Sequence, residues 1–169
     1  DPTAVPSEPA DEKPPVGVEV DNLLIDMNGI FHGSAQKVYE YGNCKPVKRL
    51  LGQRRRVIGG VQKQIAVFED VCKTVEHVVN VVKPKKRLIM CVDGVAPCAK
   101  QCQQRKRRFM SALEREKNDT QTFDSNSISP GTKFMDFLTK YVDWYIRKRM
   151  SEEGSLWENL EVVFSNEKA

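Results

Sequence analysis

Two aspartates follow short apolar segments that have the composition of buried strands. Asp26 ends the segment 22–26 and Asp93 ends the segment 88–93; both are rich in aliphatic residues and lead into glycine-containing turns. In an open parallel sheet the carboxyl ends of the strands form the ligand-binding crevice. Two carboxylates there are hard oxygen ligands for Mg²⁺ or Mn²⁺, which can activate water and stabilise the leaving oxygen of a phosphodiester. The alternative is that each aspartate caps the helix or turn after it.

A second group of polar residues lies on one stripe of a helix predicted within residues 96–117. At about 100° per residue, the stripe spans roughly 100° of the helix surface. It consists of Lys100, Gln104, Arg107 and Arg108. Arginine offers a rigid fork, lysine a point charge and glutamine a neutral donor, a combination that suits a terminal phosphate. A solvated basic face is the alternative interpretation.

The opposite side of the same predicted helix is apolar. It carries Cys98, Cys102, Phe109 and Leu113. We therefore expect the helix to bury this side while it presents its donors on the other.

The segments that must position these residues alternate between strand and helix. Strands are predicted at 22–26, 88–93 and 161–165, and helices at 61–82 and 134–150. A helix between the first two strands implies a parallel pair. The expected fold is therefore an α/β fold with a parallel sheet that helices cover on both faces.

Two segments outside these elements have biased compositions. Residues 1–17 contain five prolines and several acids, which predicts an extended arm or linker before a domain at 18–169. Residues 41–60 form a basic loop, with 54–60 clearly loop-like in composition. This loop is a candidate RNA contact or nuclear import sequence, with a solvated surface loop as the alternative.

Composition limits the class of protein. Hydrophobic residues make up 40% of the chain and charged residues 30%, and no apolar run approaches the ~20 residues of a membrane span. The five cysteines contain no CxxC pair, which favours reduced thiols in a cytoplasmic or nuclear protein that is not secreted. The net charge of +4 is concentrated in two basic clusters, which indicates a polyanionic partner.

Three long motifs resemble one family. VDNLLIDMNGIFH at 20–32, VDGVAPCAKQCQQRKRRF at 92–109 and FDSNSISPGTKFM at 123–135 occur in the order found in the XRN family of 5′→3′ exoribonucleases. The resemblance spans about residues 20–165. It implies a Rossmann-like sheet of the PIN/FEN nuclease type, incomplete in this chain.

The resemblance also implies roles for individual residues. Asp26 and Asp93 would ligate the catalytic Mg²⁺ or Mn²⁺, and His32 would stack against the first base. Residues that would select a 5′-monophosphate are Lys100, Gln104, Arg107 and Arg108. The implied partner is single-stranded RNA with a 5′-monophosphate, hydrolysed to mononucleotides in RNA degradation such as mRNA decay. Asn126 and Ser127 are weaker site candidates, because such residues usually serve turns.

The sequence also departs from the family pattern. Cys98 stands where an arginine is usual, Gln101 and Cys102 replace Met-Asn, and Ser129 replaces threonine. A glycine- and glutamate-rich motif and an aspartate pair would follow the final segment and are not in this sequence. Because a two-metal site needs more carboxylates than two, we expect this chain alone to be inactive or nearly so, with the remainder of the nuclease domain as its partner.

Two other functions fit part of the sequence. One is a module that binds RNA 5′ ends without cutting them. The other is a haloacid dehalogenase phosphatase, for which Asn28 occupies the second position of the required D-x-D pattern and makes the match poor.

Overall fold

The computed structural model describes residues 19–44, 60–117 and 123–166. Its elements in chain order are β1 (Asn22–Asp26), α1 (Met27–Tyr39), η1 (Gly42–Cys44), α2 (Gly60–Val82), β2 (Arg87–Cys91), α3 (Cys98–Lys117), η2 (Ser125–Ser127), α4 (Lys133–Met150) and β3 (Glu161–Ser165). The arm predicted at 1–17 and most of the basic loop at 41–60 lie outside the described residues. Within the described part, no helix is both long and apolar enough to span a membrane.

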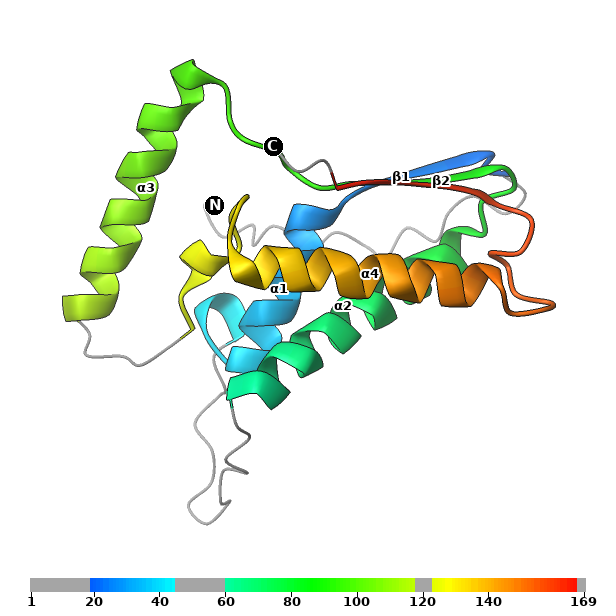
Figure 1. Ribbon diagram of the computed structural model, residues 1–169, viewed down its shortest axis with the longest axis horizontal. Coiled ribbons are helices and arrows are strands. Elements are labelled where there is room, and N and C mark those ends of the chain that lie inside the picture. The colour runs from blue at the N-terminus through cyan, green and yellow to red at the C-terminus, as the bar shows by residue number, and fades with distance from the viewer. Residues whose placement is uncertain (1–18, 45–59, 118–122, 167–169) are drawn as a thin grey trace, which may run out of the picture.

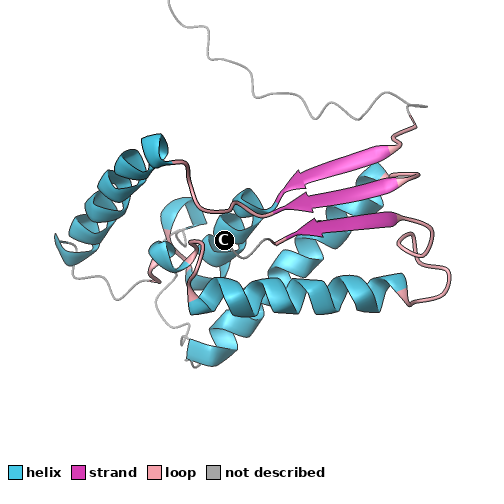
Figure 2. Cartoon of the chain, turned by 45° about the horizontal axis from the view of Figure 1, so that its top comes forward, coloured by secondary structure: helices cyan, strands magenta, loops and turns pink. Residues whose placement is uncertain are grey.

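The three strands form a parallel sheet in the order β1-β2-β3. Asp26 is in register with Cys91, and Cys91 with Ser165, so the strands end level with one another. Figure 2 shows the three arrowheads side by side and pointing the same way. The predicted α/β class and parallel pairing are confirmed, although β2 ends two residues before Asp93.

One face of the sheet packs against three helices and forms the core. Leu88 and Met90 of β2 are fully buried, and α1, α2 and α4 lie together on this side of the sheet (Figure 1). Side chains of β1 and β3 that point the same way pack against the core: Leu23, Ile25, Val162 and Phe164. Alternate strand residues face the helices, as the period of two requires.

The other face of the sheet is open in the described part of the chain. Leu24, Ile89 and Val163 are aligned across the three strands, and Leu24 is 68% exposed and Val163 42%. The prediction of a sheet covered on both faces is therefore wrong for these residues. It failed because the three helices that pack on the sheet all lie on one side, although parallel sheets are normally buried on both.

Helix α1 was missed by the sequence analysis, which expected a glycine-containing turn after Asp26. The Asp26 side chain caps the helix and accepts a hydrogen bond from the Asn28 amide at 3.0 Å. The buried face has ordinary helical spacing and consists of Met27, Phe31, Ser34 and Ala35. Gly29 and Gly33 obscured this pattern because glycine lowers helix propensity by about 1 kcal/mol relative to alanine.

Helix α2 follows the prediction closely. It starts one residue before the predicted segment and ends where Lys83 adopts a positive φ of 51° before Pro84. Its buried residues are Val67, Phe68, Val71, Cys72, Val75 and Val79. Burial raises the pKa of the Cys72 thiol to about 12, so this cysteine stays protonated and serves packing.

Helix α4 is stabilised at both of its ends. The Thr132 hydroxyl oxygen accepts a hydrogen bond from the Met135 amide at 3.3 Å, and three basic residues, Arg147, Lys148 and Arg149, occupy the last turn. These features satisfy free amides at the start of the helix and complement its dipole at the end.

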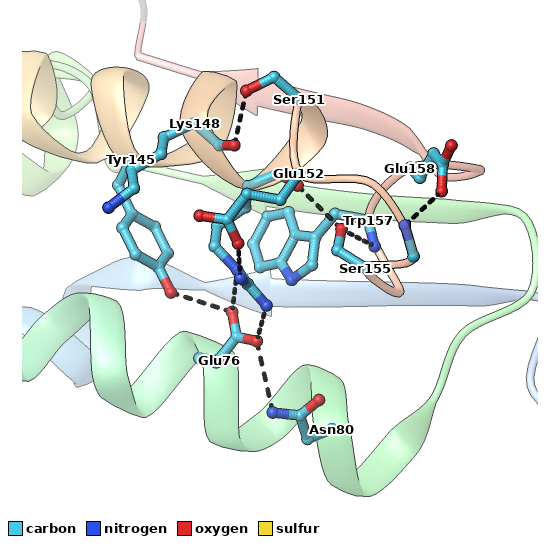
Figure 3. A network of polar contacts seen from close by, with 11 residues as sticks. Glu76, Asn80, Tyr145, Lys148, Ser151, Glu152, Ser155, Trp157 and Glu158 are labelled. Carbon is cyan, nitrogen blue, oxygen red and sulfur yellow. Dashed lines mark hydrogen bonds and ion pairs between the residues drawn. The ribbon is translucent and has the colours of Figure 1, made fainter.

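A half-buried ionic network joins α2 to α4 (Figure 3). Glu76 of α2 accepts hydrogen bonds from Tyr145 at 2.9 Å and from Arg149 at 2.6 and 3.1 Å. Arg149 also pairs with Glu152. The hydrogen bond to Glu76 raises the pKa of Arg149. The pKa of Tyr145 is also raised, mainly by burial and then by its own hydrogen bond to Glu76. One carboxylate thus fixes two side chains of the neighbouring helix.

We predict that Glu76→Ala lowers the free energy of unfolding by about 1–3 kcal/mol, because it leaves a partly buried arginine and tyrosine without their acceptor. Urea unfolding followed by circular dichroism measures the loss. Asp143→Ala is the matched control, since it removes an exposed i,i+4 partner of Arg147 on the same helix. Equal losses in the two variants would contradict a special role for the network.

Candidate phosphate and metal site

A polar cavity of about 360 Å³ lies at the carboxyl edge of the sheet. Four parts of the chain contribute to it: α1, the segment after β2, α3, and the segment from η2 to the start of α4. Its polar and glycine lining consists of Asn28, Gly29, His32, Asp93, Gly94, Gln104, Arg107, Arg108, Ser111, Ser125, Asn126 and Ser129. Residues distant in the sequence thus converge on one concave surface.

Helix α3 supplies the cationic wall of this cavity. Gln104, Arg107 and Arg108 line it, as the helical stripe predicted. Lys100 lies one turn earlier, is exposed and is not part of the lining. Ser111 lines the cavity although the sequence analysis missed it; it lies four residues after Arg107, on the same stripe, so extending the stripe by one turn would have found it.

The predicted burial of the other side of α3 is wrong. Cys98 and Cys102 are exposed and Phe109 is 63% exposed, while Leu113 is half-buried. The helix stands apart from the rest of the fold, beyond the segment that follows β2 (Figure 1). Amphipathic spacing identifies the two faces of a helix but does not supply a partner for the apolar one.

Asp26 and Asp93 leave neighbouring parallel strands at the same edge, as predicted. Asp93 is exposed and lines the cavity. Asp26 is also exposed, does not line the cavity, and caps α1 through one carboxylate oxygen. The capping role weighed as the alternative is therefore real for Asp26, and it leaves the second oxygen of that carboxylate available to another ligand.

A second cavity of about 410 Å³ lies on the other side of Asp93. It shares Asp93, Pro130 and Met135 with the first cavity. Its remaining lining is Val92, Gly131, Thr132, Lys133, Asp136, Thr139 and Asn166. Asp93 therefore stands where the two cavities meet, between the end of β2 and the start of α4.

The turn from η2 to α4 is held by local hydrogen bonds. Asp124 accepts from the Asn126 amide at 2.9 Å, and the Ser127 hydroxyl donates to the Asp124 carbonyl at 2.5 Å. The Thr132 hydroxyl lies 2.5 Å from the Ser127 carbonyl. Asn126 lines the cavity, whereas Ser127 serves the turn.

His32 lies on α1 one turn after Asn28, and both residues line the cavity. Partial burial lowers the pKa of His32 below its usual 6.5, and the nearby positive charge of Arg107 lowers it further. The imidazole is therefore neutral at pH 7. A neutral, flat ring beside two arginines suits stacking on a base and gives no cation that would repel them.

The donors at this edge suit a hard divalent cation but are few. Within 19–44, 60–117 and 123–166, no three residues among His, Cys, Asp and Glu come together as a metal-binding group. The two strand-end aspartates can provide oxygen ligands to Mg²⁺, which usually binds one or two carboxylates and keeps several waters. A site with two ions would need carboxylates beyond these.

Comparisons with known proteins identify one family. The model for the N-terminus of XRN 5′-3′ exonucleases matches residues 3–169. The chain is 36% identical to 5′-3′ exoribonuclease 1 of Saccharomyces cerevisiae over 87% of its own length and 9% of that protein. It is 34% identical to 5′-3′ exoribonuclease 2 of Gallus gallus over 92% of its length and 17% of that protein. The chain belongs to the XRN 5′-3′ exonuclease N-terminus family and spans a small part of the relatives it matches.

We predict that the imidazole of His32 titrates below 6.5 and that Arg107→Ala moves its pKa upward without restoring 6.5, because burial is the larger cause. Proton NMR of the histidine ring signals over pH 4–8 measures both values. His77, the other histidine, is exposed on α2 and reports any change that is not local to the cavity. If Arg107→Ala leaves the pKa of His32 unchanged, the charge of Arg107 does not act on the imidazole, and the prediction is wrong.

Proposed function

We propose that the protein carrying this chain hydrolyses single-stranded RNA from a 5′-monophosphorylated end with the help of Mg²⁺ or Mn²⁺. The observation that carries the proposal is the cavity at the sheet edge, where Asp93 shares one surface with Gln104, Arg107 and Arg108. The family and the named activity of its relatives agree with it.

The cationic wall of the cavity suits a terminal phosphate. Arg107 and Arg108 bring two forked donors and Gln104 a neutral one, and Ser111 adds a hydroxyl. A 5′-monophosphate carries more charge than the phosphodiesters within a chain, so it gains most from this wall. A 5′-hydroxyl or capped end has no terminal phosphate monoester to place there. Lys100, one turn before Gln104 and outside the cavity lining, is proposed to attract the RNA phosphates electrostatically.

His32 is proposed to hold the first base. Its ring lies in the same cavity as the arginines and is neutral at pH 7, so it can stack on a base without taking part in proton transfer. The open backbone at Gly29, where a Cβ would meet nothing within 4 Å, leaves room beside it. The end of the RNA would then be gripped at its phosphate and its base.

Asp26 and Asp93 are proposed to hold the metal at the edge of the sheet. A bound divalent ion would supply an activated water and a counter-charge for the leaving oxygen. The strand register fixes the two carboxylates at one edge, and the cap on α1 fixes the orientation of Asp26. The second cavity beside Asp93 provides space for further ligands from the remainder of the nuclease domain. On this proposal the chain alone has little or no activity.

A second candidate function is an RNA 5′-end binding module without catalysis. The cationic wall with Arg107 and Arg108 supports it, because phosphate binding to these side chains needs no metal. The two candidates share the phosphate pocket and differ only in whether the RNA is cut.

We expect the full-length protein with Mg²⁺ to degrade 5′-monophosphorylated RNA and to leave 5′-hydroxyl and capped RNA largely intact. Asp93→Ala should slow degradation by at least about 100-fold, since it removes a proposed metal ligand. Release of labelled mononucleotides measures both effects. Equal degradation of the three RNAs, or undiminished activity of the variant, would overturn the exonuclease proposal; binding without cleavage would establish the second candidate.

The 5′-phosphate pocket has its own test in binding. Arg107→Ala should weaken binding of 5′-monophosphorylated RNA by about tenfold or more, because a charge-assisted hydrogen bond is lost, and should affect 5′-hydroxyl RNA far less. Arg105→Ala is the matched control, since Arg105 lies on the same helix with the same charge and does not line the cavity. Equal losses for both RNAs would reduce the wall to a nonspecific basic face.

A further inference from the structure

The outer face of α4 carries exposed aromatic rings between basic side chains. Phe137 is 56% exposed and Trp144 52% exposed. At about 100° per residue they fall on one stripe with four cations. These are Lys133, Lys140, Arg147 and Lys148. We call this set, with Phe137 and Trp144, the α4 stripe.

The Trp144 ring of the α4 stripe is supported by neighbouring side chains. Trp144 lies 5.3 Å from the half-buried Tyr141, whose ring is 5.6 Å from the buried Phe68 of α2. The Lys148 ammonium lies over the Trp144 ring at 5.6 Å from its centroid. The indole is therefore supported by the core and by a cation while its remaining surface faces solvent.

The charge of the stripe favours a polyanion. Its acidic neighbours are Asp136, which pairs with Lys140 at 2.7 Å, and Asp143, which pairs with Arg147 at 2.9 Å. Four cations against two acids leave the face positive. Aromatic rings interleaved with cations are typical of surfaces that bind single-stranded nucleic acid, where bases stack and phosphates pair with lysine or arginine.

A protein partner fits the α4 stripe less well. The cores of protein interfaces are depleted in lysine, whereas here lysine separates the rings. The open sheet face offers the contrast, because Leu24, Ile89 and Val163 form an aliphatic patch of the kind that another protein layer covers. The two exposed surfaces thus differ in the chemistry they offer.

The α4 stripe begins at the candidate site. Lys133, its first member, lines the cavity that shares Asp93 with the phosphate pocket. Trp144 lies eleven residues further along, about 16 Å at the rise of an α-helix. That is the length of about five stacked nucleotides at 3.4 Å each. Only RNA several nucleotides longer than the part held at the site can reach the indole.

We propose that the α4 stripe binds the single-stranded RNA downstream of the scissile bond, with bases stacked on Phe137 and Trp144. The proposal rests on the 5′-end function proposed above and extends it to the path of the RNA. It makes Phe137 and Trp144 positioning residues, which act on long substrates and are not needed for contact with the first nucleotide.

The test compares a 5′-monophosphorylated trinucleotide with an oligoadenylate of about twelve nucleotides, both bound to the full-length protein in EDTA so that neither is cut. Trp144→Ala should weaken binding of the longer RNA by about fivefold or more and leave the trinucleotide unaffected, and Phe137→Ala should also weaken binding of the longer RNA. Trp144→Phe should restore most of the affinity, because it keeps a stacking surface. Val81→Ala, at the exposed end of α2, is the control for an exposed apolar residue elsewhere.

Fluorescence gives an independent readout. The fluorescence of Trp144 is the difference between the emission of the unmodified protein and that of the Trp144→Phe variant. Acrylamide should quench this fluorescence in the free protein. The longer RNA should quench it as well, and the trinucleotide should not. An indole already shielded in the free protein would show that polypeptide covers this face and would overturn the proposal. Unchanged binding of the longer RNA by Trp144→Ala would overturn it as well. A trinucleotide that binds equally with a 5′-hydroxyl would instead overturn the 5′-end function on which the proposal rests.

Discussion

The parallel, level pairing of three short strands is the constraint on which the candidate site depends. Because Asp26, Cys91 and Ser165 are in register, every segment that leaves the sheet does so at the same edge. A slip of one residue would turn the side chains of a strand to the other face and remove Leu88 and Met90 from the core. Burial of these residues against the helices therefore also fixes where Asp26 and Asp93 lie.

Asp26 shows how one residue can serve both the fold and the site. It ends β1, caps α1 and, on the proposed function, ligates a metal. The cap uses one carboxylate oxygen and starts α1 directly after β1, so that Asn28 and His32 in the first two turns line the cavity. The interpretations of this aspartate as a cap and as a ligand, which the sequence left as alternatives, are thus compatible.

The sequence predicted the elements whose patterns are dominated by burial. The strands at 22–26 and 161–165 and the helices at 61–82 and 134–150 were correct to within one residue at each end, because aliphatic runs and helical spacing report directly on a buried face. Helix α1 was missed, since two glycines interrupt its pattern and its cap lies in the preceding strand. The polar stripe of α3 was predicted without knowledge of the sheet, and three of its four members line the cavity.

The errors share a physical cause. The pattern of a sequence shows which side chains favour burial, but the layer that buries them is a property of the assembled fold. Phe109 on α3 and the aligned Leu24 and Val163 on the sheet are apolar and exposed in the described part of the chain. Their pattern predicted a layer packed over them, and the described residues do not supply that layer. The polar side chains of the candidate site do not depend on such a layer. His32, Asp93 and Arg107 come from three segments and line one cavity. The α1 cap positions the helix that carries His32, the strand register brings the segment with Asp93 to the same edge, and α3, which follows that segment, presents Arg107. The candidate site therefore forms through local and sheet-level interactions, although in the described part of the chain the apolar surfaces around it lack a partner.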